Sequence, residues 1–220
     1  MATLHSLYSN KDDRYFSTPC SGILPLLPQS ANRVLEIGCG EGTTLSWIQN
    51  TLHASWVGGV ELNEEAAKAA AQKLDWLCQG DFEAMELPFE ENSIDLVLCL
   101  DVLEHLVDPW SAIRKLTRLI SPGGSLIASI PNIRHHSVTL PLILRGEWKY
   151  GNKDILDITH LRFFTKQASI ELVQIGGLRV NEVLTAKLAK GSKSWLANLI
   201  SFGLLRQFFV FQYLIKASKA

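Results

Sequence analysis

The sequence predicts an α/β protein built on a doubly wound parallel sheet, and three observations lead to this prediction. From Arg33 onward, short apolar runs alternate with helix-like stretches, as in chains whose parallel strands are joined by crossover helices. The run Ile94–Leu100 is apolar except at Asp95, which is typical of a strand covered on both faces. A glycine-rich turn follows the first strand and opens a helix, an arrangement that suits a bound ligand.

The expected elements follow one another without an internal repeat. Strands are expected at Arg33–Ile37, Trp56–Glu61, Trp76–Gln79, Ile94–Leu100, Ser125–Ile130, Leu178–Ala186 and Phe208–Ile215. Helices are expected at Thr43–Leu52, Glu64–Leu74, Asp108–Ile120, Val138–Arg145 and Thr165–Gly176. Asn63 can cap the helix that begins at Glu64, because its side chain can accept a hydrogen bond from the first turn. Pro131 ends the fifth strand, since proline has no N–H to donate to a sheet.

The composition of the 220 residues fits an ordinary soluble globule and excludes several classes of protein. Hydrophobic residues make up 47% and charged residues 20%, which excludes a disordered chain. Lys and Arg (21) nearly balance Asp and Glu (22), so general binding of nucleic acid is not expected. The cysteines show no paired spacing, which indicates neither a zinc site nor a disulfide framework and predicts reduced thiols in a cytoplasmic protein. They are Cys20, Cys39, Cys78 and Cys99.

The tail contains the only candidate membrane segment, Trp195–Ile215. Polar residues interrupt it at Asn198, Arg206, Gln207 and Gln212, so no transmembrane span is expected. Residues 1–17 are polar and charged, which argues against a secretory signal. Apolar residues recur at helical spacing after Lys187, Lys190 and Lys193. Such a helix can lie on an anionic membrane or pack onto the sheet or a second subunit, and packing is favoured.

The most informative segment is the glycine-rich turn after the first strand. Residues Glu36–Gly42 read EIGCGEG, with glycines at alternate positions and an acid two residues before the first glycine. The missing side chains let a ligand approach the backbone. A dinucleotide fingerprint would place its third glycine where Thr43 stands, so the spacing argues against NAD and favours a different nucleoside ligand.

Two further acids follow the second and third strands. Glu61 stands where a carboxylate can accept hydrogen bonds from both ribose hydroxyls. Asp81 can accept from an exocyclic amine while Phe82 packs against a ring. An ordinary helix-start acid and an ordinary turn residue are the alternatives for Glu61 and Asp81, and the ordered series favours ligand binding.

This ordered series resembles the class I S-adenosylmethionine-dependent methyltransferases over about residues 30–185. The resemblance implies a Rossmann-like seven-stranded sheet of order 3-2-1-4-5-7-6 whose last strand is antiparallel, and Phe208–Ile215 is the candidate for that strand. It also implies S-adenosyl-L-methionine as the methyl donor and S-adenosyl-L-homocysteine as the product. The residues expected to contact this cofactor are Glu36, Gly38, Cys39, Gly40, Gly42, Glu61, Leu62, Asp81, Phe82 and Leu100.

Shorter matches are similar to a bacterial subgroup that includes the methionine-biosynthesis protein W family and methyltransferases of cell-surface glycan genes. They lie at Pro131–His135, Leu144–Gly146 and His160–Phe163. We therefore expect one methyltransferase domain over residues 1–220, with an N-terminal cap at 1–30, a substrate lid at 132–166 and a helical insertion at 187–207. The lid carries six basic and three acidic residues, which suits either an anionic acceptor or a solvated surface. The candidate acceptor contacts are His135, Tyr150, His160 and Arg162.

His105 is the candidate general base, because ligands of open α/β sheets bind beyond the carboxyl ends of the strands. A histidine that packs beside the cofactor without moving a proton is the alternative. The spacing Asp101-x-x-Glu104-His105 is similar to the metal-binding E-x-x-E-H pattern of some small-RNA and quinone O-methyltransferases. On a helix these three side chains would share a face. Related enzymes with the same acids often use no metal, and none is expected here.

The expected function is S-adenosylmethionine-dependent methyl transfer to a small-molecule or glycan acceptor, at oxygen. The alternative is a catalytically silent partner protein of the same fold within a biosynthetic complex. An NAD-dependent oxidoreductase is disfavoured by Thr43. The chain could form a homodimer or bind a different protein, and the sequence does not favour either arrangement.

Overall fold

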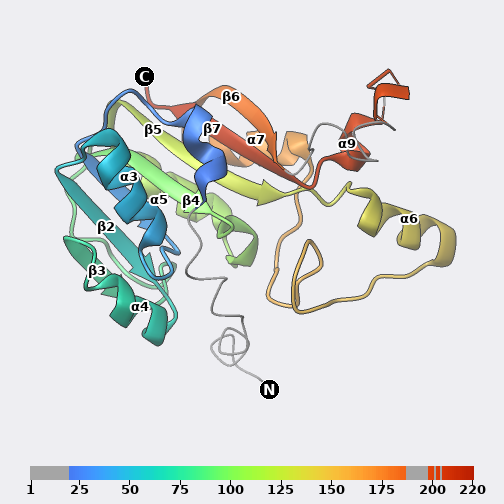
Figure 1. Ribbon diagram of the computed structural model, residues 1–220, viewed down its shortest axis with the longest axis horizontal. Helices are drawn as coiled ribbons and strands as arrows, with labels where there is room; N and C mark the ends of the chain where they lie inside the picture. The colour runs from blue at the N-terminus through green and yellow to red at the C-terminus, as the bar shows by residue number, and fades with distance from the viewer. Residues whose placement is uncertain (1–19, 187–197, 201, 204) are drawn as a thin grey trace.

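A seven-stranded mixed sheet forms the centre of the computed structural model, which describes residues 20–186, 198–200, 202–203 and 205–220 (Figure 1). The strands are β1 (Arg33–Ile37), β2 (Trp56–Glu61), β3 (Trp76–Gln79), β4 (Ile94–Leu100), β5 (Ile120–Pro131), β6 (Arg179–Ala186) and β7 (Gln212–Ser218). Their order is β3-β2-β1-β4-β5-β7-β6. Strands β1 to β5 pair in parallel, and β7 pairs antiparallel with both β5 and β6. The expected strand order and the antiparallel last strand are confirmed.

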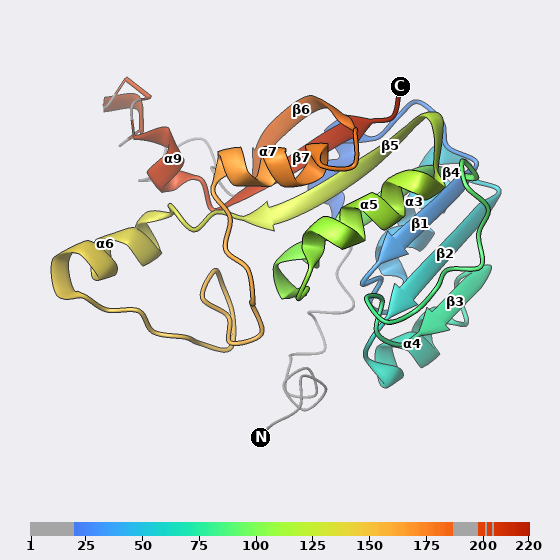
Figure 2. The same cartoon turned by 180° about the vertical axis from the view of Figure 1, so that it is seen from behind.

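Helices cover both faces of the sheet (Figures 1 and 2). The helical segments of the structure are η1 (Ser21–Leu26), α3 (Thr43–Leu52), α4 (Glu64–Ala70), η2 (Leu103–His105), α5 (Pro109–Leu119), α6 (His136–Arg145), α7 (Lys166–Gln174) and α9 (Arg206–Phe209). Apolar side chains of η1, α3 and α4 pack on one face, and those of α5 and α7 pack on the other. The doubly wound architecture predicted from the sequence is therefore present.

Strand β4 shows why its sequence is apolar almost without interruption. Leu96, Leu98 and Leu100 belong to the apolar layer beneath η1 and α3. Val97 and Cys99 belong to the opposite layer beneath α5 and α7. Successive side chains of a strand point to opposite faces, so a strand covered on both sides needs apolar residues at every position.

Helix α4 begins where the sequence predicts and ends earlier. The Asn63 side chain accepts from the backbone N–H of Ala66 at 2.9 Å, which confirms the predicted N-cap. The helix was expected to continue to Leu74 but ends at Ala70. After that point the backbone N–H of Lys73 bonds the carbonyl of Ala70 three residues back, a tightened final turn that leads into β3.

The tail is the largest departure from the sequence-based expectation. Phe208 and Phe209 were expected in a strand, but they lie in the short helix α9, and β7 begins only at Gln212. The Asn132 side-chain amide donates to the carbonyls of Gln207 (2.7 Å) and Val210 (2.8 Å). These bonds hold the α9 backbone in place, so a tertiary contact overrides the aromatic residues' preference for strands.

The lid leaves the sheet after β5 and returns to it. Helix α6 extends away from the sheet, and a long loop leads back toward α7 (Figure 1). On its return, the backbone N–H groups of Leu161 and Arg162 donate to the carbonyl of Glu104 at 2.8 and 2.9 Å. The lid is thereby tied to the segment that follows β4.

Two of the sequence-based assignments reach beyond the described residues. Residues 1–19 of the expected N-terminal cap and residues 187–197 of the expected helical insertion lie outside them. The described part of the cap is η1, whose Ile23 and Leu26 are fully buried in the layer beneath α3. Over the part of the chain that the structure describes, no helix is both long enough and apolar enough to cross a membrane.

Candidate functional site

A pocket of about 370 Å³ opens beyond the carboxyl ends of β1, β2 and β4. Strand order reverses between β1 and β4, and ligands of open α/β sheets bind at such a reversal. Nine of the predicted cofactor contacts line this pocket: Glu36, Gly38, Cys39, Gly40, Glu61, Leu62, Asp81, Phe82 and Leu100. Gly42, the tenth predicted contact, is not among the described residues that line the pocket. It is the N-cap residue of α3.

The glycine turn needs glycine for two physical reasons. Gly38, Gly40 and Gly42 have φ values of 70°, 54° and 74°, which side chains rarely permit. A Cβ atom at Gly38 would lie 2.2 Å from Cγ2 of Val102, so there is no room for a side chain. The turn therefore keeps bare backbone on the pocket wall, which a ligand can approach closely.

Glu61 joins the glycine turn to the start of α4. One carboxylate oxygen accepts from the backbone N–H of Gly40 at 2.8 Å, and the other accepts from that of Asn63 at 2.7 Å. Burial raises the pKa of Glu61, and the backbone N–H groups that bind the carboxylate oppose this rise. Each oxygen keeps a second lone pair, which can accept a ligand hydroxyl.

Glu36 is a buried acid whose environment fits a cationic ligand. It is 3% exposed, and among the described residues its Oε2 atom has no hydrogen-bond partner. Burial raises its pKa well above the usual range, and the negative charge of Glu61 adds to the effect. A ligand that brings N–H donors or positive charge would satisfy this oxygen. The ammonium and sulfonium groups of S-adenosylmethionine have this character.

The far end of the pocket is formed by the loop after β3. Phe82 is 5% exposed and packs with the core, and the Lys115 ammonium lies 4.5 Å from its ring centroid. Asp81 accepts from the backbone N–H of Glu83 at 2.9 Å. The Glu83 carboxylate accepts from the N–H groups of Val107 (2.8 Å) and Asp108 (2.7 Å), which draws the segment after η2 to the pocket.

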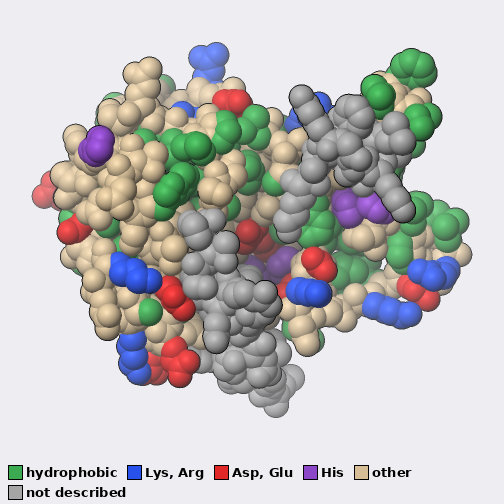
Figure 3. Space-filling view, viewed as in Figure 1, with side chains coloured by type: hydrophobic (Ala, Val, Ile, Leu, Met, Phe, Trp, Pro, Cys, Tyr) green, Lys and Arg blue, Asp and Glu red, His purple; other side chains and the backbone are tan. Residues whose placement is uncertain are grey.

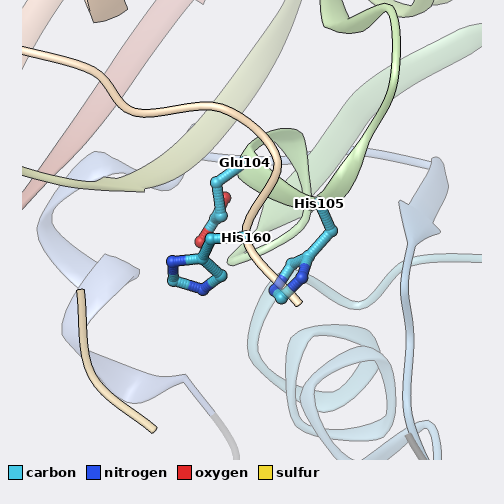
Figure 4. A group of neighbouring side chains, drawn as sticks. All are labelled: Glu104, His105 and His160. Atoms are coloured by element: carbon cyan, nitrogen blue, oxygen red, sulfur yellow. The ribbon is translucent and has the colours of Figure 1, made fainter. Parts of the chain in front are cut away.

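Glu104, His105 and His160 form a cluster beside the pocket, and His105 also lines it (Figure 4). One side-chain atom from each of the three lies within 4.8 Å of the others. The two imidazole rings meet edge to face with centroids 4.6 Å apart. Nδ1 of His105 lies 3.1 Å from the Thr159 carbonyl, and Nδ1 of His160 lies 3.0 Å from the Ile155 carbonyl. A carbonyl only accepts, so we assign the proton of each neutral ring to Nδ1.

Glu104 is the most unusual member of the cluster. It is 1% exposed, and neither carboxylate oxygen has a hydrogen-bond partner among the described residues. Burial raises its pKa well above the usual range, and the charges of Asp101 and Asp157 raise it further. One carboxylate and two imidazoles are a donor set that divalent transition metals accept. The cluster therefore fits a metal ion as well as a protonated acid.

The predicted shared face of Asp101, Glu104 and His105 does not form. Asp101 precedes the single turn of η2 and has a φ of 55°. Its backbone N–H donates to Oγ of Ser129 at 2.9 Å, and its carboxylate accepts from the Gln212 side chain. His160, which was predicted as an acceptor contact, takes the third place in the cluster.

The other predicted acceptor contacts lie in different surroundings. His135 caps α6, because its Nδ1 accepts from the N–H of Ser137. Burial lowers its pKa to about 4, and neighbouring His136 contributes. Tyr150 is exposed and packs with Trp148 and Phe163 of the lid. Neither His135 nor Tyr150 is among the described residues that line the pocket.

The Arg162 side chain reaches the edge of the pocket and binds a backbone carbonyl there. Its guanidinium donates to the carbonyl of Val107, which lines the pocket, and lies 5.8 Å from the Trp110 ring centroid.

The pocket wall also includes Cys20 and Thr44, which were not predicted from the sequence. The backbone N–H of Cys20 donates to Oγ1 of Thr44 at 3.2 Å. Neither residue belongs to a recognisable pattern, so no sequence signal pointed to them.

Comparison with known proteins agrees with this geometry. Residues 35–128 match a family described as a methyltransferase domain. The chain is 36% identical over 131 residues to the 27-O-demethylrifamycin SV methyltransferase of Amycolatopsis mediterranei, a match covering 57% of this chain and 45% of that protein. It is 32% identical over 160 residues to the ubiquinone biosynthesis O-methyltransferase of Xanthomonas oryzae pv. oryzae, covering 66% and 65%. The matches thus span between 45% and 65% of the length of these two relatives.

The fold also matches a solved structure. A SAM dependent methyltransferase from Archaeoglobus fulgidus superposes with a TM-score of 0.67 at 20% sequence identity, covering 90% of this chain and 92% of that one. This likeness shows the shared fold. The methionine-biosynthesis protein W subgroup is not tested by these matches and stays a prediction.

Proposed function

We propose that the chain is a class I S-adenosylmethionine-dependent methyltransferase that methylates an oxygen atom of a small-molecule or glycan acceptor. The observation that carries the proposal is the pocket beyond β1 and β4, which is lined by the glycine turn, by Glu36 with its unsatisfied oxygen and by His105. The names of the two relatives support an oxygen acceptor. One is named as a methyltransferase of an O-demethyl compound, and the other is named as an O-methyltransferase.

Each part of the pocket has a proposed role in holding the cofactor. The backbone of Gly38 and Gly40 lies along the methionine part, with Glu36 near its positive charge. Glu61 accepts the ribose hydroxyls through the lone pairs that its two backbone bonds leave. Asp81 and Phe82 hold the adenine. The bound sulfonium supplies an electrophilic methyl carbon.

His105 then has the position of a general base. The Thr159 carbonyl orients its ring through Nδ1, and Nε2 is the nitrogen that would receive the proton of an acceptor hydroxyl. Alignment of the acceptor is the larger requirement, because the methyl carbon is already reactive. Arg162, whose guanidinium binds the Val107 carbonyl at the pocket edge, supplies positive charge for that purpose.

A metal-assisted form of the reaction is the second candidate, and the two unsatisfied oxygens of Glu104 favour it. Glu104, His105 and His160 would hold the ion, and a divalent cation would lower the pKa of an acceptor hydroxyl. Calorimetric titration of the purified protein with Mn²⁺ separates the two forms. Binding that Glu104→Gln and His160→Ala both abolish supports the metal, whereas absence of binding leaves proton transfer to His105 alone.

The cofactor site is tested by calorimetric titration with S-adenosylhomocysteine, with NAD as the control ligand. The expected result is micromolar affinity for S-adenosylhomocysteine alone (about −8 kcal/mol). Gly38→Ala should abolish this binding, because its Cβ would meet Val102. Gly177→Ala is the matched control: its φ is 87°, and its Cβ would have nothing within 4 Å. Equal loss in both variants, or binding of NAD alone, would contradict the assignment.

The chemistry is tested by methyl transfer to a panel of anionic sugars and hydroxylated ring compounds. With an acceptor from that panel, His105→Gln should lower kcat by about 100-fold or more while S-adenosylhomocysteine binding persists. Methylation at nitrogen would contradict the proposed acceptor atom. A stable copurifying chain together with no turnover would favour the silent partner instead.

A further inference from the structure

One end of the molecule exposes large apolar side chains on two neighbouring segments. Hydrophobic side chains gather over α6 and over the segment that precedes α9 (Figure 3). We call these residues the apolar end surface: Leu140, Leu142, Ile143, Leu144, Leu199, Ile200, Phe202 and Leu205. Ile143 is 73% exposed, Leu144 75% and Phe202 95%. Single exposed apolar residues are ordinary, but a group of this size marks an interaction surface.

Helix α6 has little other reason to be apolar. Val138 is its one buried residue among those described, although the helix contains three leucines, an isoleucine and a proline. Packing against the core therefore explains only a small part of this helix's hydrophobicity. The remaining apolar side chains face outward at the far side of the molecule from β3 (Figure 1).

The two segments belong to one fixed end of the structure. Asn132, at the root of the lid, donates to the carbonyls of Gln207 and Val210. Nδ1 of His136, the first residue of α6, lies 3.1 Å from the carbonyl of Phe208. The Arg134 guanidinium lies 5.0 Å from the Phe208 ring centroid. These contacts join α6 to α9, so the two apolar segments are held at the same end of the structure.

The charge around this surface is basic. Where α6 meets α9, the Arg134 guanidinium donates to the Gln207 side chain, and Arg206 is the first residue of α9. At the end of α6, Arg145 and Lys149 both contact Glu147, at 3.5 and 3.3 Å, which leaves one positive charge in excess. A second copy docked face to face would bring like charges together, whereas an anionic surface would attract them.

We propose that the apolar end surface docks on the face of an anionic lipid bilayer, with Ile143, Leu144 and Phe202 entering the headgroup region. Exposed apolar tips surrounded by basic residues are the combination that binds such a surface. This inference goes beyond the proposed function, because it concerns where the chain works and not which atom it methylates. The lid loop runs from α6 to His160, so the docked surface lies at one end of a segment whose other end reaches the site.

Vesicle cosedimentation tests this proposal with the full chain. Wild-type protein should sediment with vesicles that contain phosphatidylglycerol and not with pure phosphatidylcholine, and added salt should weaken the binding. The double variant Ile143→Gln/Leu144→Gln should bind about tenfold more weakly, because two apolar side chains no longer leave water. Ile175→Gln is the control: this residue is 41% exposed at the end of α7, away from the apolar end surface.

Three results would overturn the proposal. The first is that wild-type protein does not sediment with anionic vesicles. The second is that wild type and the double variant bind the vesicles equally well. The third is that the Ile175→Gln control loses as much vesicle binding as the double variant. A wild-type dimer in light scattering that the double variant converts to monomers, without vesicle binding, would assign the surface to a second copy. S-adenosylhomocysteine affinity is measured on the same proteins and should not change, so failure of the cofactor site and failure of this surface are distinguishable.

Discussion

At the scale of single residues, Glu61 connects structure to function through one carboxylate. Its two oxygens bind the backbone N–H groups of Gly40 and Asn63, which belong to two separate turns of the pocket wall. The sequence could predict an acid here, because Glu61 ends an apolar strand about twenty residues after the glycine turn. It could not predict the role of Glu83, because the two backbone N–H groups that donate to its carboxylate belong to a distant segment of the chain.

Glu61→Gln should destabilise both the fold and the bound cofactor. The amide replaces one acceptor oxygen with an NH₂ group, which must face a backbone N–H. We expect the free energy of unfolding to fall by about 1–3 kcal/mol and S-adenosylhomocysteine affinity to fall at least about tenfold. Urea unfolding and calorimetry measure the two effects. Glu65→Gln, an exposed acid on α4, is the control and should leave both values near wild type; equal affinities for Glu61→Gln and wild type would contradict the prediction.

Glu36 should make the stability of the cofactor-free protein depend on pH. Its folded pKa lies well above the ordinary value of 4.5 because the side chain is buried. Above pH 4.5 the unfolded chain releases this proton while the folded chain keeps it, so the free energy of unfolding falls as pH rises toward the folded pKa. Glu36→Gln should remove up to about 1.4 kcal/mol of change per pH unit in that window. Urea unfolding across the window checks this, and parallel curves for both proteins would contradict it.

At the scale of elements, the sheet was more predictable than its surroundings. Strands β1 to β4 match their predicted bounds, because strands covered on both faces leave a continuous apolar signal. Helix α9 was misread as strand, because Phe208 and Phe209 prefer strands locally and the contacts that hold them in a helix come from Asn132 and His136, which are far away in sequence. The third member of the cluster around Glu104 could not be predicted for a similar reason: His160 reaches it from a lid whose path the sequence does not reveal.

Asp95 illustrates an element-scale role away from the site. Its Oδ2 atom accepts from the backbone N–H groups of Asn32 (2.9 Å) and Arg33 (3.0 Å), and Oδ1 accepts from the Ser121 hydroxyl (3.1 Å). Asp95→Ala should lower the free energy of unfolding by about 1–3 kcal/mol, because three hydrogen bonds to partly exposed donors are lost together. Calorimetry should find unchanged S-adenosylhomocysteine affinity. A selective loss of that affinity would show that this end of the sheet is coupled to the pocket.

At the scale of the whole molecule, strand order came from the family resemblance and not from the residues alone. Hydrophobic periodicity marks a strand but does not say which neighbours it pairs with. Strand β7 lies between β5 and β6, and its Tyr213 and Ile215 are almost fully buried. The pocket's general position could be predicted, because it follows from a glycine turn at the end of β1. The apolar end surface could not, since its exposure depends on how α6 leaves the sheet.

A chain that stops at Phe211 should fail to complete the sheet. Without β7, strands β5 and β6 both lose a hydrogen-bonding neighbour, and the apolar layer over α7 is uncovered. We expect this truncated protein to aggregate or to lose cooperative thermal unfolding. Circular dichroism on heating is the measurement. A chain that stops at Lys219 is the control, since it keeps β7 and the hydrogen bonds of Lys219. Cooperative unfolding of the chain that stops at Phe211 would contradict the prediction.

The position of β7 has a consequence for the order in which the fold can be assembled. During synthesis β5 leaves the ribosome long before β7 does, so one edge of the growing sheet stays unpaired while the lid, α7 and β6 are made. Strand β7, which follows both neighbours in the chain, must then insert between two strands already in place. The nascent chain is therefore open to strand-to-strand association, and to capture by chaperones, until β7 has been made.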